Sequence, residues 1–183
     1  MPYNTVMFNV PAILKRLDIK HGYTVADLGT GREARMALAA AKLVGEDGIV
    51  YAADVVKSLL PAVMTKAAMY GFKNVRPVWT NLEIYGAAKA IADNSVDVAF
   101  IVTVLFQSKK QAEIIKEAMR VLKPGGRLAI IDWKKNQDSP IGPAMDRRIN
   151  PESIKQIAEG QLGMRLQDEF DAGKCHWGLI FVK

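Results

Sequence analysis

Residues 23–45 constrain the fold more than any other stretch of the sequence. A short apolar run ends in an acid, Asp27, and the chain then passes through Gly29 and Gly31 into a long helical pattern. This order predicts a strand, a tight glycine turn and the beginning of a helix. Glycines allow positive φ angles and a close approach of the backbone to a ligand. The first turn of a helix also presents unpaired N–H groups to anionic or polar atoms, so we expect a ligand at this turn.

A second strand that ends in an acid follows shortly afterwards. Residues 48–55 form an apolar run that reaches Asp54 near its end. Two consecutive strands that end in acids beside a glycine turn are typical of a nucleoside site. The phosphate or amino-acid end of the ligand is then expected at the turn, with the ribose hydroxyls on Asp54.

The rest of the chain alternates between strand and helix patterns with little spare loop. The predicted strands are short and almost continuously apolar, as strands covered on both faces should be. This alternation predicts a parallel, doubly wound α/β sheet. The strands are expected at residues 23–28, 49–53, 75–79, 96–102 and 127–132, and the helices at 33–44, 58–70, 83–92 and 108–122, with Gly71 and Gly125–Gly126 as helix stops.

The pattern changes after Asp132. A loop at residues 134–150, rich in Pro, Asp and Asn, leads to a helix that begins at Pro151. Two further apolar runs, residues 165–170 and 176–182, are separated by only a short turn. They are therefore predicted to form an antiparallel hairpin.

The composition is that of an ordinary globular chain. Its 183 residues suffice for one domain with a sizeable core, and we expect a single domain over residues 1–183. No apolar run reaches the roughly 18 residues of a membrane span. Residues 1–20 lack a signal-peptide layout and predict an entry segment and a short helix. Cys175 is the only cysteine, which excludes an intrachain disulfide and favours a cytoplasmic location.

The net charge of +6 raises the question of nucleic-acid binding. The basic residues are scattered, mostly on polar helix faces beside glutamates, and are densest at Lys134–Lys135 and Arg147–Arg148. We interpret them mainly as a solvated surface. A nucleic-acid partner is therefore less favoured than a small molecule, and the sequence does not indicate an oligomeric state.

Taken together, four motifs resemble those of class I S-adenosylmethionine-dependent methyltransferases. They are VADLGTG at the glycine turn, VYAADV at the second strand, DNSVDVAF before the fourth strand and RVLKPGGRLAIIDWKK around the fifth. The final HWGLIFVK is also similar to the family's last strand. The closest likeness is to small proteins related to the ubiquinone/menaquinone-biosynthesis C-methyltransferases. The resemblance implies a Rossmann-like, mostly parallel seven-stranded sheet with an antiparallel last strand, and S-adenosylmethionine as cofactor with no metal.

The resemblance also implies a set of cofactor-binding residues. The turn would pass beneath the cofactor, Asp27 would orient its methionine end and Asp54 would accept hydrogen bonds from both ribose hydroxyls. Asn81 would accept a bond from the adenine amine, Leu82 would donate its backbone N–H to the ring, and Val55 would cover one adenine face. Thr103 would lie where the sulfonium meets the acceptor. The full set is Asp27, Gly29, Thr30, Gly31, Asp54, Val55, Asn81, Leu82 and Thr103.

The sequence departs from the family pattern in three places. Glu33 replaces the third glycine of the motif, and its carboxylate would either repel the cofactor's carboxylate or bind its ammonium. Asn81 stands where relatives usually carry an aspartate. Residues 104–107, VLFQ, lack the His and Glu that relatives often show. No catalytic residue can be assigned, and a silent, cofactor-binding member of the fold becomes an alternative.

The acceptor is expected over the carboxyl ends of the strands, covered by the 134–150 loop. Gly142, Arg147, Arg148 and His176 are the candidate substrate residues. Simpler roles compete at several of the predicted positions. The acids at the strand ends can cap turns or helices, Asn81 can cap the helix predicted after it, and His176 can belong to the core.

Methyl transfer from S-adenosylmethionine to a small molecule is the leading hypothesis. RNA methylation ranks lower, because the chain shows no added RNA-binding module. An NAD-dependent dehydrogenase is a third hypothesis, since GTGREA formally fits the dinucleotide fingerprint. Against it, the preceding strand ends in Asp27, and too little chain is left for a substrate domain.

Overall fold

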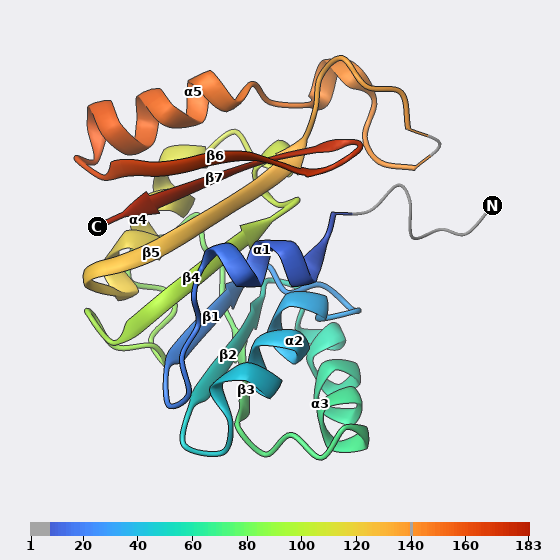
Figure 1. Cartoon of the computed structure of the whole chain (residues 1–183), viewed down its shortest axis with the longest axis vertical. Helices are drawn as coiled ribbons and strands as arrows, with labels where there is room; N and C mark the ends of the chain where they lie inside the picture. The colour runs from blue at the N-terminus through green and yellow to red at the C-terminus, as the bar shows by residue number, and fades with distance from the viewer. Residues whose placement is uncertain (1–7, 140) are drawn as a thin grey trace.

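The computed structural model describes residues 8–139 and 141–183, and this part of the chain contains one seven-stranded sheet (Figure 1). The strand order is β3-β2-β1-β4-β5-β7-β6. The strands are β1 (Thr24–Leu28), β2 (Ile49–Asp54), β3 (Val75–Trp79), β4 (Val96–Val102), β5 (Leu122–Trp133), β6 (Arg165–Gly173) and β7 (His176–Val182).

Strand directions agree with the predicted doubly wound sheet. Strands β1 to β5 are parallel to one another, while β7 lies antiparallel to both β5 and β6. The chain winds outward from β1 to β2 and β3 on one side and returns to β4 and β5 on the other. The connections after β1 and β4 therefore diverge, and the crevice between them is where an open α/β sheet binds its ligand.

Helices cover both faces of the sheet. On one face lie α1 (Val10–Arg16), α2 (Arg35–Val44) and α3 (Leu60–Met69), which are drawn toward the viewer in Figure 1. The other face is covered by α4 (Gln111–Val121), by α5 (Pro151–Lys155) with the π-helical turn that continues it (Gln156–Gln161), and by the chain after β3. Short 3₁₀ turns lie at Lys57–Leu59, Leu105–Gln107 and Met145–Arg147.

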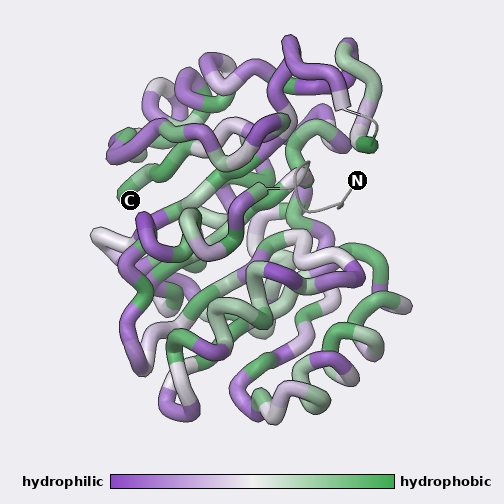
Figure 2. Tube along the Cα trace, turned by 45° about the vertical axis from the view of Figure 1, so that its right-hand side comes forward, coloured by the Kyte–Doolittle hydropathy of each residue, from purple (hydrophilic) through white to green (hydrophobic). Residues whose placement is uncertain are grey.

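Each face of the sheet has its own core, because side chains alternate along a strand. In β4, Val98, Phe100 and Val102 pack toward α1–α3, whereas Ala99 and Ile101 pack toward α4. Figure 2 shows hydrophobic stretches along the strands inside the molecule and hydrophilic ones in many outer turns. None of the helices in residues 8–139 and 141–183 combines the length and the apolar character that a membrane-spanning helix needs.

The helix predicted at residues 83–92 is absent, and this prediction was wrong. The segment forms successive turns, and Gly86 takes a φ of +76°. The buried carboxylate of Glu117 on α4 accepts hydrogen bonds from the backbone nitrogens of Gly86 (2.7 Å) and Ala88 (3.0 Å). These donors are satisfied by a side chain and not by a helical ladder, so the segment stays irregular although Ala88 and Ile91 are buried.

Two predicted boundaries also differ. Helix α4 ends at Val121 and β5 begins directly at Leu122, so Gly125–Gly126 lie within an irregular part of β5 and do not end the helix. Strand β6 continues to Gly173, which shortens the turn of the predicted hairpin. The short N-terminal helix is present as α1, whereas residues 1–7 of the predicted entry segment lie outside the described residues.

Candidate cofactor site

The turn after β1 requires glycine at its first position. Gly29 has a φ of +90°, and a Cβ added there would lie 2.3 Å from Cγ2 of Val104. Gly31 also has a positive φ, +61°, with open space where a side chain would project. The backbone nitrogens of Gly29 and Thr30 both donate to the carbonyl of Ala53 at 2.9 Å. The turn is therefore fixed against the end of β2 and leaves its outer surface open to a ligand.

Asp27 holds this turn to the start of α2. One carboxylate oxygen accepts hydrogen bonds from Oγ1 of Thr30 (2.8 Å) and from the backbone nitrogen of Ala37 (3.0 Å). Helix α2 needs this acceptor, because Ala34 at its N-cap has a left-handed φ of 47° and no side-chain cap. Asp27 thus has the capping role that competed with ligand binding, and its other oxygen remains available. Burial raises the pKa of Asp27 to about 6.

Asp54 faces the turn from the end of β2. Its Oδ2 accepts a hydrogen bond from the nitrogen of Gly31 and its Oδ1 accepts one from the nitrogen of Val56, both at 2.9 Å. The side chain is therefore pinned in one orientation. Each carboxylate oxygen has a second lone pair, so both can still accept from a vicinal diol.

Two pockets meet over the glycine turn. One of about 230 Å³ contains Asp27 and Thr30, and a second of about 520 Å³ contains Asp54, Val55, Asn81 and Leu82. They share Gly29, Gly31, Val102 and Thr103, so they form one trough across the crevice between β1 and β4. Every residue predicted to contact the cofactor lines this trough. That each one contacts it remains a prediction.

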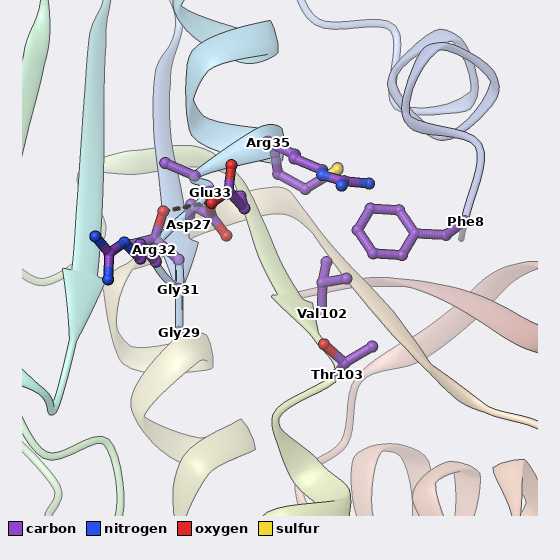
Figure 3. A pocket seen from close by; sticks show the side chains of 12 residues that line it. Phe8, Asp27, Gly29, Gly31, Arg32, Glu33, Arg35, Val102 and Thr103 are labelled. Atoms are coloured by element: carbon purple, nitrogen blue, oxygen red, sulfur yellow. Dashed lines mark hydrogen bonds between the residues drawn. The ribbon is translucent and has the colours of Figure 1, made fainter. Parts of the chain in front are cut away.

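The chain after β4 is strained where the two pockets join. Thr103 has a φ of +53°, which a β-branched residue rarely adopts. Its nitrogen donates to the carbonyl of Ile131 and its own carbonyl accepts from Nε2 of Gln107, both at 2.8 Å. Strain that is held in place by its surroundings is typical of binding sites. Figure 3 shows Thr103 and Val102 across the pocket from the glycine turn.

The larger pocket contains one polar group that the sequence did not reveal. Thr80 is buried, and its hydroxyl has no hydrogen-bond partner within the described residues. The only sequence signal was its place at the end of β3, beside Asn81. Oδ1 of Asn81 accepts a hydrogen bond from the nitrogen of Glu83 at 2.9 Å, so it caps a turn and not the helix expected there. The unpaired Thr80 hydroxyl makes a polar ligand the better fit for this pocket.

Glu33 lines the pocket that contains Asp27, and its carboxylate already has a partner within the chain. Its carboxylate forms an ion pair with Nζ of Lys66 on α3 at 2.7 Å, and Lys66 also donates to the carbonyl of Arg32. Lys66 lowers the pKa of Glu33, mainly through this hydrogen bond. The negative charge at the third glycine position is thus already partnered by a cation of this chain.

We expect Glu33→Gln to change cofactor affinity and thermal stability only slightly, because exposed ion pairs contribute little. Glu113→Gln, on the exposed face of α4, is the matched control. Calorimetric titration with S-adenosylhomocysteine measures the affinity. A loss of about tenfold or more with Glu33→Gln alone would show that Glu33 binds the cofactor directly.

The candidate substrate residues only partly come together. Gly142 packs flat on the ring of Trp133, where an added Cβ would lie 2.8 Å from ring carbons. The ring centroid of His176 lies 4.1 Å from that of Trp133, and the guanidinium carbon of Arg148 lies 5.7 Å from it. Arg147 is exposed, and no described contact joins it to this group. Burial, with the nearby charges of Arg148 and Lys134, lowers the pKa of His176 to about 4, so its ring is neutral at physiological pH.

Among the described residues, no group of three or more His, Cys, Asp or Glu side chains could hold a metal ion. The donor set of the trough is instead that of an organic ligand. It consists of two carboxylates, a free hydroxyl and a backbone turn of glycines. These groups fit the amino-acid, ribose and base portions of a nucleoside such as S-adenosylmethionine.

Comparison with known families decides the class. A family model described as a methyltransferase domain matches residues 19–173. The chain belongs to this methyltransferase family. S-adenosylmethionine is the cofactor that the assignment implies, and the dehydrogenase hypothesis has no support from it.

Individual relatives agree with the family. The ubiquinone/menaquinone biosynthesis C-methyltransferase UbiE of Klebsiella pneumoniae is 32% identical over 145 residues, which cover 76% of this chain and 56% of that protein. This methyltransferase chain thus spans little more than half of that relative's length. A SAM-dependent methyltransferase from Aquifex aeolicus is 29% identical and superimposes with a TM-score of 0.86 over 100% of this chain and 93% of the other.

A more distant structure shows the fold alone. It is described as a putative type 11 methyltransferase from Sulfolobus solfataricus and is 24% identical, with a TM-score of 0.67 over 93% of this chain and 87% of the other. The superposition with the Aquifex aeolicus structure covers the whole chain, including the antiparallel end of the sheet, where β7 carries His176.

Proposed function

We propose that this methyltransferase chain transfers the methyl group of S-adenosylmethionine to a small-molecule acceptor. The observation that carries the proposal is the continuous trough over Gly29 and Gly31, with Asp27 at one end and Asp54 at the other. In this arrangement Asp27 can accept a hydrogen bond from the ammonium of the donor, and Asp54 can accept hydrogen bonds from its ribose hydroxyls. The names of the relatives, which include a quinone-pathway methyltransferase, support the same chemistry.

The reaction does not need a dedicated catalytic side chain. The methyl group is already activated by the sulfonium, so the protein mainly has to align the two reactants and exclude water. Thr103 and Val102 lie where the two pockets join, beside the expected position of the sulfonium. Their part in the reaction is positional, and the VLFQ departure therefore does not remove a necessary group.

The contacts of the basic residues in the loop at residues 134–150 favour a small acceptor over RNA. Lys134 pairs with Asp171, and Arg148 is buried among backbone carbonyls. Of the four cations at the densest basic spots, Lys134 is thus ion-paired within the chain and Arg148 is buried, so neither is a free surface cation for RNA phosphates. The cytoplasm remains the proposed location, supported by the single cysteine, Cys175, which is buried.

Turnover with labelled donor tests the proposal. The purified protein is incubated with methyl-labelled S-adenosylmethionine and with fractionated small-molecule, RNA and protein extracts. Transfer of label to a small-molecule fraction is the expected result. Label found only in RNA would assign the RNA alternative, and donor binding with no transfer to any fraction would favour the catalytically silent alternative.

We expect donor affinity to depend on the ionisation of Asp27. Its pKa of about 6 lies above the ordinary 3.8 because burial disfavours the charge. Between about pH 4 and about pH 6 the folded protein therefore holds a proton on Asp27 that the unfolded chain has already lost. The free energy of unfolding of the free protein falls as the pH rises through this interval. The donor's ammonium needs the ionised form, so affinity should be about tenfold weaker at about pH 5 than at about pH 7.5.

Calorimetry with S-adenosylhomocysteine across this interval measures the effect, and it should also detect proton release on binding. Asp27→Asn is the matched variant, because it keeps an acceptor for Thr30 and Ala37 without a titrating group. Its affinity should not change over the interval. The same pH profile in parent and variant would remove Asp27 from the donor site.

A further inference from the structure

Three unpaired polar atoms gather in two touching rings. Within the described residues, Nε1 of Trp133 and both Nδ1 and Nε2 of His176 are buried without a hydrogen-bond partner. The two residues are paired across β5 and β7, and their ring centroids are 4.1 Å apart. His176 is 0% exposed and Trp133 6% exposed. Buried polar groups are nearly always hydrogen-bonded, so these rings indicate that a partner binds there.

A buried positive charge lies beside the same rings. Arg148 is 4% exposed, and it donates to the carbonyls of Pro143 (3.0 Å), Lys134 (2.8 Å) and Gln137 (2.5 Å). No carboxylate in the described part of the chain forms an ion pair with it, although a buried charge is normally paired with an opposite one. The carbonyl dipoles fix its position and leave its charge without a counter-ion.

The nature of the missing partner follows from these groups. The indole of Trp133 can only donate, and the neutral imidazole of His176 carries one N–H. An ionised carboxylate accepts hydrogen bonds at two oxygens and supplies the negative charge that Arg148 lacks. A neutral hydroxyl or amide could accept from the same two N–H groups, but it would leave the guanidinium uncompensated. The second ring nitrogen of His176 is an acceptor, which the carboxylate does not satisfy.

We propose that the methyl acceptor is a small carboxylate, held by hydrogen bonds from Trp133 Nε1–H and from the ring N–H of His176 in the field of Arg148. This rests on the proposed function, because the carboxylate is assigned to the acceptor. The pair lies at the carboxyl end of β5, on the same edge of the sheet as the glycine turn.

Phe8 lies between the trough and the proposed anion site, which is formed by Trp133, His176 and Arg148. Its ring lies 5.6 Å from His176 in an edge-on contact, and it also lines the pocket that contains Asp27 and Thr103. Figure 3 shows the ring directed from the start of the chain toward Val102 and Thr103. The proposal therefore requires the Phe8 side chain to move, so that the acceptor's carboxylate reaches the rings while its reacting atom faces the donor.

Benzoate and its neutral analogue benzamide test the inference. Calorimetric titrations are made on the protein with and without saturating S-adenosylhomocysteine. We expect benzoate to bind at least about tenfold more tightly than benzamide, as a charge-assisted hydrogen bond implies. Trp133→Phe and His176→Phe keep an aromatic ring and remove the donors, and each should weaken benzoate binding by about tenfold or more without changing affinity for S-adenosylhomocysteine.

His21→Phe is the control, because it replaces the chain's other histidine, which is exposed and precedes β1 at the opposite end of the sheet. It should leave benzoate binding unchanged. Equal affinities for benzoate and benzamide, or benzoate binding that survives both ring substitutions, would overturn the inference. The titration without nucleoside measures binding at the anion site alone. A failure of the protein to bind S-adenosylhomocysteine would contradict the proposed function and would leave the result for the anion site distinguishable from it.

Discussion

Glu117→Ala is expected to lower the free energy of unfolding by about 3–5 kcal/mol, the range for removing one partner of a buried ion pair. The Glu117 side chain is 1% exposed and pairs with Arg120 at 2.8 Å, itself 7% exposed. The same carboxylate accepts the backbone nitrogens of Gly86 and Ala88. Its removal leaves a buried guanidinium and two backbone donors without their acceptor, while the exposed Asp93 retains part of the pairing with Arg120.

Urea denaturation of the parent and the variant measures this loss. Glu113→Ala, one turn earlier on the exposed side of α4, is the control and should stay within about 0.5 kcal/mol of the parent. A loss for Glu117→Ala as small as that of the control would mean that the segment after β3 is held by its apolar contacts alone.

Asp54→Ala is expected to weaken S-adenosylhomocysteine binding by at least about tenfold to a hundredfold. Hydrogen bonds from the ribose hydroxyls to an ionised acceptor are worth about 1.5–3 kcal/mol each. The substitution should also lower thermal stability, because Asp54 is buried and accepts hydrogen bonds from the backbone nitrogens of Gly31 and Val56.

Asp54→Asn separates the two roles. The amide keeps one acceptor oxygen and the side-chain volume, so it should preserve the turn better than alanine does. It should still weaken the binding of S-adenosylhomocysteine. Calorimetry gives the affinities and thermal unfolding gives the stabilities. An unchanged affinity in Asp54→Ala would remove this residue from the ribose site.

The strands and the glycine turn were predictable because their signals are local. The apolar runs around Asp27 and Asp54 determine where β1 and β2 end, and a parallel sheet then brings both acids to one edge. The hairpin of β6 and β7 followed from the shortness of its turn. The positions of the residues that line the trough could therefore be anticipated from order and spacing.

Features that depend on distant partners could not be anticipated. The chain at residues 83–92 has a helical pattern, but a carboxylate from α4 satisfies its backbone nitrogens instead. Glu33 pairs with Lys66 of another helix, so its sequence neighbours gave no sign of its orientation. The contact between Trp133 and His176 arises only from the pairing of β5 with β7.

Calorimetric titration of the purified protein with S-adenosylmethionine, S-adenosylhomocysteine and NAD tests the central claim most directly. The two sulfur nucleosides should bind with measurable heat at a single site, because the trough has an acid at each end and a glycine turn between them. NAD should give no binding. Binding of NAD with no response to either sulfur nucleoside would contradict the account.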